Sequence, residues 1–463
     1  TFALANQNFA TATDSHNVVI GYDAGNVIST GLSNTIIGSL AGNALTASSS
    51  NTVVGQNALG ADTLGSNTTA IGAGALQAQN FTTASESYNT AVGTYAGASV
   101  TTGQYNTFIG RASADAVTDA DENVAVGYNS LSTNTLGNRA VAIGTGALAT
   151  MNFTTATDSG NTAIGQAAGF SVTTGLSNTL VGHGTGDALT DGSNNVTLGK
   201  GSLGADTRGC RSIAIGSSAL SAQNSSTLAN VYNVAIGDNA GAAVTTGVRN
   251  TIVGSLAGDA LTEGTDNVII GYNSATHTTD LTTGDSNVLV GAYTHTSGAD
   301  VNAAHGFGYN LSCDGGFTTL GEGSNDIRAA HGTASWATVS DERYKKDIVD
   351  STAGLSFINA LKPKTFKYKN LGDLPDTFRA YEKDSTEVFK NTKTNHGFIA
   401  QEVKAAIDAD SSIKDGFKLW DERDDGGQEV AEAALIPILV KAIQELAALN
   451  TALTARVKTL EDA

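Results

Sequence analysis

The chain has 463 residues, too many for one ordinary domain, and contains 54 glycines but only 3 prolines. This balance excludes collagen, which needs glycine at every third position, and low-complexity disorder, which brings proline with its glycine. The net charge is −19, and residues 1–339 carry −15 of it because they hold 22 acidic and only 7 basic side chains. So acidic a region argues against nucleic acid or an anionic membrane as a partner.

A five-residue pattern, Asn-[Thr/Val]-x-[Ile/Val/Leu]-Gly, recurs through residues 1–291. The steps between its glycines run 17, 17, 17 and 21 residues three times and then 17, 17 and 20, so the superrepeat is 72 residues. Asn-Phe at Phe9, Phe81 and Phe153 opens the longer loops, and the fourth copy has Ser225 in place of phenylalanine. A fixed period indicates a repeat architecture, and short strands between turns predict a mainly β fold, a β-solenoid shaft. The glycines are residues 21, 38, 55, 72, 93, 110, 127, 144, 165, 182, 199, 216, 237, 254, 271 and 291.

Each unit is interpreted as one coil of the solenoid. In the unit that begins at Asn161, Thr162 and Ile164 share one face of a strand and Ala163 points the other way. We predict that the Thr and Ile positions fill the coil interior and that the small middle residue allows close packing outside. Gly165 then takes a tight corner with positive φ. The leading asparagines are expected to hydrogen-bond to one another from coil to coil, as in an amide ladder.

Sixteen such coils, stacked at strand spacing, form a rod of about 75 Å. A coil this thin leaves an apolar flank bare, so side-by-side oligomerisation is expected. The strand half of each unit resembles the β-roll head of trimeric autotransporter adhesins, whose repeats centre on a similar Asn-x-x-x-Ile-Gly element. The 17- and 21-residue steps depart from the shorter adhesin repeat.

The shaft shows no pattern that predicts a bound small molecule. Its Gly-x-Gly sequences lack the following helix of a dinucleotide site. Its acidic turns are not repeated in the first superrepeat, and its histidines have no ligand spacing, so we expect neither a cofactor nor a metal ion. The loops with Phe9, Phe81 and Phe153 are either corner plugs or a contact surface. Cys210 and Cys313 are expected to be free, and no run of 18 apolar residues predicts membrane insertion.

Residues 292–339 are predicted to contain degenerate repeats and a neck. From Ser340 the composition becomes that of an ordinary globular protein, and residues 340–434 predict a small α+β domain. A helix is expected at 354–361 and a strand at 365–369. An irregular arm follows at 370–394, and then a strand that enters a helix at 396–403.

Residues 435–463 carry a heptad repeat and predict a C-terminal coiled coil. Its β-branched a positions, leucine d positions and central Asn450 form a pattern typical of parallel dimers. The a positions are Ile436, Ile443, Asn450 and Val457, and the d positions are Leu439, Leu446, Leu453 and Leu460.

Residues 340–348 read Ser-Asp-Glu-Arg-Tyr-Lys-Lys-Asp-Ile, which fits Ser-Asp-x-Arg-x-Lys-x-x-Ile. This resembles the cleavage motif of the self-cleaving intramolecular chaperone domain at the C-terminus of phage endosialidases and many phage tail fibres. The segments LKPKTFKY, GFIAQEV and LIPILVKAIQEL follow in the order of that family, so the likeness spans about residues 338–460. The resemblance implies a homotrimer, against the dimer pattern of the heptads, and we follow it because a three-fold head and chaperone must match.

The motif also supports a mechanism. A serine is a weak nucleophile until a base removes its proton, and the candidate base is Lys345. A lysine with an ordinary pKa of about 10.4 stays charged at pH 7, so the hypothesis requires that trimer assembly bury it. Ser340 would then attack the carbonyl of Val339 and cut the chain between the two residues, while Asp341 and Arg343 orient the loop. The alternative is that Ser340 only caps a helix, with acidic residues in the first turn.

These features together predict a phage tail fibre or tailspike, located in the virion, that attaches to a host receptor expected to be a glycan. The sequence begins at Thr1 without a signal-like stretch. We therefore expect it to be a fragment of a longer parent whose N-terminal part joins tail or baseplate proteins. A bacterial surface adhesin is one alternative, although it would need a membrane-anchoring C-terminus. A depolymerase with a glycosidase site between subunits is another.

Overall fold

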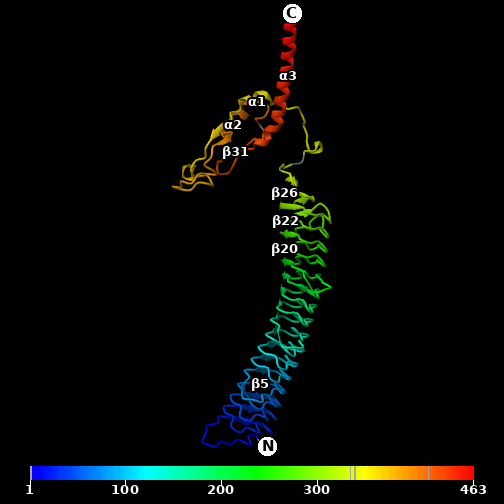
Figure 1. Cartoon of the computed structure of the whole chain (residues 1–463), viewed down its shortest axis with the longest axis vertical. Coiled ribbons are helices and arrows are strands. Elements are labelled where there is room, and N and C mark those ends of the chain that lie inside the picture. The colour runs from blue at the N-terminus through cyan, green and yellow to red at the C-terminus, as the bar shows by residue number, and fades with distance from the viewer. Residues whose placement is uncertain (1–2, 334, 338–339, 415–416) are drawn as a thin grey trace. The chain divides into compact units, whose positions relative to one another are not determined.

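The structure is a computed structural model that describes residues 3–333, 335–337, 340–414 and 417–463. The chain divides into two compact units, residues 1–339 and residues 340–463. The first unit is a β-solenoid, as predicted, and its strands lie above one another along one side of the unit, as β5, β20, β22 and β26 show in Figure 1.

Eighteen strands of this unit stack in parallel, one for each coil, and each pairs in register with its neighbour. The stack exceeds the sixteen predicted repeats because the degenerate segments around His305 and Thr318 continue it. The stacked strands are β1 (Val18–Ile20), β2 (Thr35–Ile37), β3 (Thr52–Val54), β5 (Thr69–Ile71), β7 (Thr90–Val92), β8 (Thr107–Ile109), β9 (Val124–Val126), β11 (Val141–Ile143), β13 (Thr162–Ile164), β14 (Thr179–Val181), β15 (Val196–Leu198), β17 (Ile213–Ile215), β19 (Val234–Ile236), β20 (Thr251–Val253), β21 (Val268–Ile270), β22 (Val288–Val290), β24 (His305–Tyr309) and β26 (Phe317–Glu322).

The side chains that fill the coil interior are opposite to those that the sequence predicts. In β13, Ala163 is fully buried, whereas Thr162 and Ile164 face outward and Ile164 is 38 % exposed. The prediction is wrong because strand alternation shows which residues share a face but not which face is the interior. The buried middle residues of β2 to β22 are Ile36, Val53, Ala70, Ala91, Phe108, Ala125, Ala142, Ala163, Leu180, Thr197, Ala214, Ala235, Ile252, Ile269 and Leu289.

The leading asparagines form a buried ladder, but most of its bonds go to backbone groups. The backbone N–H of Asn178 donates to Oδ1 of Asn161 at 2.9 Å, and Nδ2 of Asn178 donates to the Gly192 carbonyl at 2.9 Å. The predicted bond between amides also occurs here, from Asn178 Nδ2 to Asn161 Oδ1 at 3.2 Å. At the rung from Asn89 to Asn106 the backbone N–H of Asn106 donates to Oδ1 of Asn89 at 2.9 Å. Each asparagine therefore satisfies polar groups of the corner that no strand partner reaches.

The glycine that ends each strand occupies a corner with positive φ, as predicted. Gly127 has a φ of +135°, a conformation that residues with a Cβ rarely adopt. A Cβ added to Gly127 would lie 2.6 Å from the carbonyl oxygen of Gly144, the glycine of the next coil. Both the backbone conformation and the close stacking of coils therefore require glycine here.

A polar pair that the sequence analysis missed lies inside the solenoid. Gln79 Nε2 donates to Asp62 Oδ2 at 2.7 Å, and the backbone N–H groups of Gly65 and Phe81 donate to Asp62 Oδ1 at 3.0 and 3.2 Å. Burial raises the pKa of the Asp62 carboxyl, although these hydrogen bonds oppose the shift.

The same pair recurs two superrepeats further along the chain, but not in the superrepeat between. Asp206 accepts from Gln223 Nε2 at 2.6 Å, 144 residues after the first pair, whereas the block between them has Asn134 and Met151 at these places. The Asn134 amide bonds to Gly137 instead, and a Met replaces the glutamine that would have needed an acceptor. Acid and glutamine therefore change together, as a buried hydrogen-bonded pair requires.

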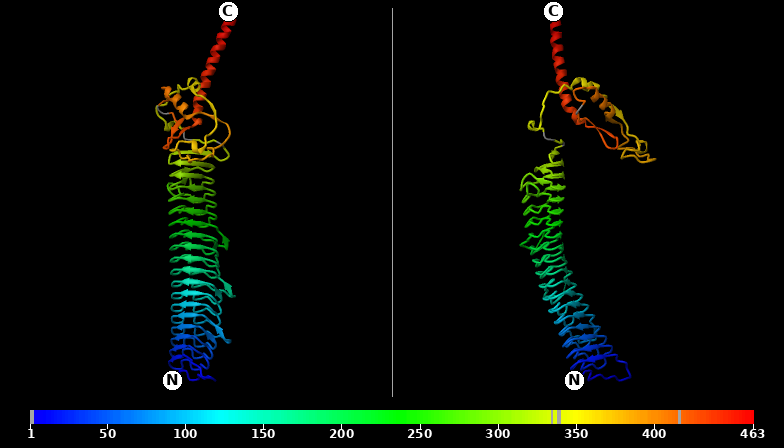
Figure 2. Two further views of the ribbon diagram at one scale, coloured as in Figure 1. Left: turned by 90° about the vertical axis from the view of Figure 1, so that its left-hand side faces the viewer. Right: turned by 180° about the vertical axis from the view of Figure 1, so that it is seen from behind.

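The long coils project at regular intervals from one edge of the solenoid, as the left view in Figure 2 shows. Phe81 and Phe153 are 5 % and 6 % exposed, so they plug corners, which is one of the two predicted roles. Cys210 and Cys313 are free and buried, and burial raises the pKa of the Cys313 thiol to about 12. Short paired strands flank the long loops: β4 (Gly65–Ser66) with β6 (Ser85–Glu86), β10 (Gly137–Asn138) with β12 (Thr157–Asp158), β16 (Gly209–Cys210) with β18 (Ala229–Asn230), and, near the end, β23 (His295–Thr296) with β25 (Ser312–Cys313).

The end of the solenoid differs from a simple neck. β27 (Asn325–Ala330) turns back and pairs antiparallel with β26, so the last coil closes with a hairpin. An antiparallel strand at this place ends the stack of parallel coils. Residues 334, 338 and 339 lie outside the described residues.

The second unit is a small α+β domain, as predicted. Three helices pack around a core that includes Phe357, Val403, Ile407, Leu419 and Ile438. The predicted helix and the strand that enters a helix are confirmed, and the strand expected at 365–369 is shorter than expected. The elements are η1 (Glu342–Tyr344), α1 (Leu355–Ala360), β28 (Lys364–Phe366), η2 (Leu371–Asp373), β29 (Asn395–Gly397), α2 (Ala400–Ala409), β30 (Trp420–Glu422), β31 (Gln428–Val430), η3 (Glu432–Leu435) and α3 (Ile436–Glu461).

The long helix α3 has two apolar faces, of which one is covered. Ile438 and Ala442 are buried against the rest of the domain. The a and d residues face solvent instead, and Ile443 is 65 % exposed and Leu460 71 %. An exposed heptad face is what a coiled-coil helix presents to its partners, so the coiled coil stays a prediction.

Candidate active site

The motif at residues 340–348 is arranged around a single turn of 3-10 helix, η1. Ser340 lies just before this turn and Lys345 just after it, so the turn brings their side chains together. Lys345 Nζ lies 2.8 Å from Ser340 Oγ and donates a hydrogen bond to it. A spacing of five residues does not place two side chains on one face of an α-helix, and here a loop of the same chain solves that problem.

The turn is held by its acidic cap. Asp341, not Ser340, is the N-cap residue, and its Oδ1 accepts from the backbone N–H of Arg343 at 2.9 Å. The Arg343 guanidinium also pairs with both carboxylate oxygens of Asp341, at 3.0 and 2.6 Å. The hydrogen bonds from Arg343 lower the pKa of the Asp341 carboxyl. The alternative in which Ser340 is the cap is therefore wrong, and the Ser340 hydroxyl is left to meet Lys345.

The pair lies on an exposed segment in which charged residues outnumber apolar ones. Ser340 and Lys345 are both exposed. Beside them Tyr344 is 78 %, Ile348 61 % and Val349 85 % exposed. The Val339 carbonyl, which the predicted mechanism would have Ser340 attack, lies outside the described residues.

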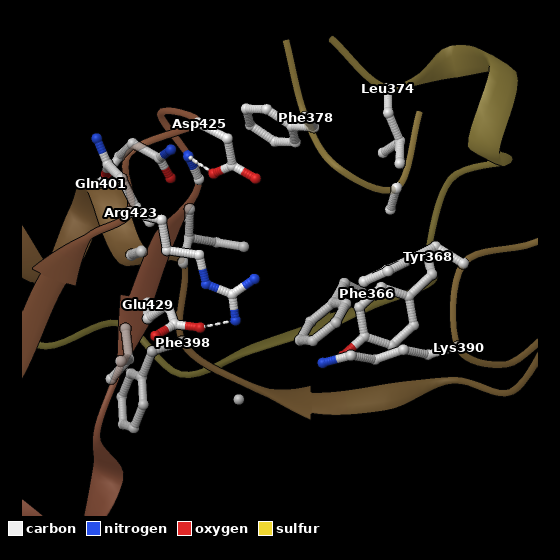
Figure 3. A pocket seen from close by; sticks show the side chains of 18 of the residues that line it. Phe366, Tyr368, Leu374, Phe378, Lys390, Phe398, Gln401, Arg423, Asp425 and Glu429 are labelled. Atoms are coloured by element: carbon white, nitrogen blue, oxygen red, sulfur yellow. Dashed lines mark hydrogen bonds and ion pairs between the residues drawn. The ribbon is translucent and has the colours of Figure 1, made fainter. Parts of the chain in front are cut away.

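A cavity lies elsewhere in the same unit and is lined by other residues. Figure 3 shows Phe366, Tyr368 and Phe378 around a cavity of about 630 Å³, with an ion pair between Arg423 and Glu429 on one wall. No serine or cysteine occurs among its lining residues that the structure describes. The cavity therefore lacks a serine or cysteine nucleophile among those residues, whereas Ser340 lies in direct contact with a lysine.

Part of the second unit matches a known protein family. Residues 340–410 match the model of a protein family described as chaperone of endosialidase. No curated protein and no solved structure matched the chain. The matched segment begins at Ser340, the first residue of the second unit.

The second unit therefore contains an endosialidase-type chaperone domain that follows a β-solenoid, and this family is that of the autoproteolytic chaperone domain. A chaperone domain of this family implies trimerisation of the chain that carries it. A β-solenoid joined to such a domain fits phage tail fibre and spike proteins. No helix in the described part of the chain is long and apolar enough to cross a membrane.

Proposed function

We propose that this chain is a phage tail fibre or tailspike protein whose C-terminal chaperone drives trimerisation and then cuts itself off between Val339 and Ser340. The observation that carries the proposal is the 2.8 Å contact between Lys345 Nζ and Ser340 Oγ at the start of the matched domain. Ser340 is the nucleophile and Lys345 the general base, while Asp341 and Arg343 hold the turn between them.

The reaction is an attack by Ser340 on the peptide bond that precedes it. The Oγ–C bond forms at the Val339 carbonyl carbon, and the C–N bond between Val339 and Ser340 breaks. Lys345 takes the hydroxyl proton and returns a proton to the leaving nitrogen, which leaves an ester on Ser340. Water then hydrolyses this ester, releases the Val339 carboxylate and restores the serine, now with a free α-amino group.

Assembly supplies the condition that the single chain lacks. In the observed contact a lysine N–H donates to the hydroxyl, whereas catalysis needs the hydroxyl to donate to a neutral amine. Burial disfavours the ammonium and favours the amine. The exposed side chains of Tyr344, Ile348 and Val349 beside the pair are the surface that further chains would cover. Cleavage would then follow trimer formation and report that it is complete.

The shaft fits a role in attachment. It is acidic, which discourages nonspecific binding, and its repeated coils give an extended rod that presents the same surface many times. We propose that it reaches a host-surface receptor, expected to be a glycan, and that the protein works in the virion.

The decisive test replaces Ser340 with alanine. Denaturing gels of the purified wild type are expected to show residues 340–463 as a separate fragment of 124 residues, and Ser340→Ala is expected to give only the intact chain. Ser356→Ala, on α1 of the same unit, is the matched control and should cleave normally. A wild type that never yields the fragment, or a Ser340→Ala chain that still does, would show the proposal to be wrong.

A further inference from the structure

Three tyrosines form a column on the surface of the last solenoid coils, at the level of the strand labelled β22 in Figure 1. Tyr272 and Tyr293 follow the corner glycines after β21 and β22, and Tyr309 ends β24. The ring of Tyr293 makes edge-to-face contacts with both neighbours, at centroid distances of 5.5 Å to Tyr272 and 5.7 Å to Tyr309. Tyr272 is 49 % and Tyr309 50 % exposed, so these contacts leave much of both rings open. We call the three side chains the tyrosine column.

The tyrosine column departs from the repeat that surrounds it. In the three coils before it, the residue after the corner glycine is Ser217, Asp238 or Ser255. Nowhere else in the repeat array do three successive coils carry tyrosine within two residues of this glycine. The coil does not need a large side chain here, because the preceding coils fold with small polar ones. Aromatic residues that gather at a surface corner without a packing role indicate a binding site.

A longer loop lies beside the column. The step between corner glycines is 20 residues here, three more than the usual 17. In the preceding coil the Leu261 N–H donates to the Gly258 carbonyl at 3.1 Å, and this bond closes the turn. The equivalent Leu281 N–H donates to the Ala275 carbonyl at 2.9 Å, so three extra residues bulge out between these two. Insertions into single coils of a repeat protein often form its binding face.

The bulge places His277 against the column and is itself anchored. The exposed His277 ring lies 4.6 Å from that of Tyr293, between centroids. His295 is 7 % exposed, its Nδ1 lies 2.9 Å from the Tyr293 carbonyl oxygen and its Nε2 lies 2.6 Å from Thr278 Oγ1. Because a carbonyl only accepts, Nδ1 of the neutral ring donates to it and Nε2 accepts from the Thr278 hydroxyl. Loop and column are therefore held in shape before a ligand arrives, which lowers the entropic cost of binding.

The chemistry of this surface suits a sugar chain. Aromatic rings carry negative charge on their faces, which attracts the polarised C–H groups of a pyranose ring. Each phenol adds a hydroxyl that donates and accepts hydrogen bonds, as sugar hydroxyls do. Three coils at strand spacing cover about 10 Å, enough for two or three consecutive sugar units. The column is therefore an extended, shallow platform for a glycan.

The charge around the column selects among glycans and other partners. Residues 254–333 hold 9 acidic side chains and 1 basic one, Arg328, which is paired with Asp314. This surface repels an acidic sugar or a nucleic acid. A stable protein partner would need about 800 Å² on each side, more than three half-exposed rings provide.

We propose that the tyrosine column, together with His277, binds uncharged sugar units of a glycan. The inference rests on the proposed function for the role of the shaft in attachment. It adds the location of the receptor site, in the last coils before the chaperone unit, and the class of receptor, a neutral glycan. Acidic glycans such as sialylated chains are excluded from this site by its charge.

The test compares two tyrosines that have the same place in their coils. Tyr272→Ala removes a ring of the column. Tyr128→Ala is the matched control, because Tyr128 also follows a corner glycine and is 47 % exposed but has no tyrosine at this corner in either adjacent coil. The purified full chains are applied to an array of neutral glycans (mannose, glucose, galactose and N-acetylhexosamine oligomers) and of sialylated and sulfated ones. We expect the wild type and Tyr128→Ala to bind neutral glycans equally, and Tyr272→Ala to bind them at least about tenfold more weakly.

Denaturing gels and sedimentation of the same preparations separate the possible failures. A wild type that binds only anionic glycans, or none, contradicts the inference, as does a Tyr272→Ala chain that binds as tightly as the wild type. In each case a trimer that yields the 124-residue fragment leaves the proposed chaperone function intact. A wild type that neither forms a trimer nor yields the fragment contradicts the proposed function, whatever it binds. Equal melting temperatures of the two alanine variants would show that the loss of binding does not come from misfolding.

Discussion

The solenoid and the chaperone unit differ in what completes them. In the solenoid each coil is completed by its neighbours in the same chain: middle strand residues such as Ala163 are fully buried, and the Asn178 amide bonds to groups of the adjacent coils. In the chaperone unit the heptad face of α3 is exposed, as are Tyr344, Ile348 and Val349 close to the motif.

Under the proposed function, this difference would assign different tasks to the two units. A stack of similar coils can grow within one chain, as the parallel pairing of successive strands shows. The heptad face of α3 would be used only when other chains arrive.

The largest expected effect is on cleavage. Lys345→Arg keeps a positive charge near Ser340 but removes the base, because a guanidinium does not lose its proton near neutral pH. We expect cleavage to slow by at least about a hundredfold, measured by the appearance of the 124-residue fragment on denaturing gels. Lys346→Arg, at the next position, is the control and should cleave at the rate of the wild type. Rapid cleavage by the Lys345→Arg variant would show that Lys345 is not the general base.

The second prediction concerns the solenoid alone. Gly127→Ala adds a Cβ at a φ of +135° and 2.6 Å from the Gly144 carbonyl oxygen, and we expect it to cost about 1–3 kcal/mol of unfolding free energy. Gly201→Ala is the matched control, because Gly201 also has a positive φ, of 62°, but nothing lies within 4 Å of its added Cβ. Chemical denaturation should show the larger loss for Gly127→Ala. Equal losses would mean that the stacking contact between glycines does not matter.

The smallest effect is a change in pH dependence. Burial raises the pKa of Asp62 above that of the unfolded chain, so its contribution to stability is fully present below the unfolded pKa and is lost as the pH rises through the folded pKa. Asp62→Asn combined with Gln79→Met copies the pair Asn134 and Met151 of the next superrepeat. We expect the double variant to lose less stability than the wild type between pH 4 and pH 7. A steeper loss of stability in the double variant would contradict a raised pKa of Asp62 in the folded chain.

The sequence predicted the solenoid well because its signal is periodic. Glycines such as Gly127 mark the corners, and the 72-residue unit locates the long loops with Phe81 and Phe153. It did not predict which strand face is the interior, because alternation is symmetric between faces. Side chains that face outward, such as Thr162 and Ile164, are uncharged as well, so composition does not separate the two faces either.

The sequence proposed the residues of the candidate site but did not predict their geometry. The motif identified Ser340 and Lys345 by resemblance to a family, whereas their spacing alone argued against a shared helix face. The 3-10 turn depends on Asp341 accepting from the Arg343 backbone N–H, a local capping choice that competes with several others for a polar segment. Whether residues 292–339 and 435–463 act as separate parts stays a prediction.

The central claim is tested most directly by monitoring cleavage and assembly in the same samples. Native mass measurements on freshly purified wild type should be paired with denaturing gels of the same samples over time and at several dilutions. The account predicts that the fragment appears only where three chains of 46.8 kDa have associated, and that Ser340→Ala forms the same trimer without any fragment. A folded single chain that releases residues 340–463 at a rate independent of concentration would contradict it.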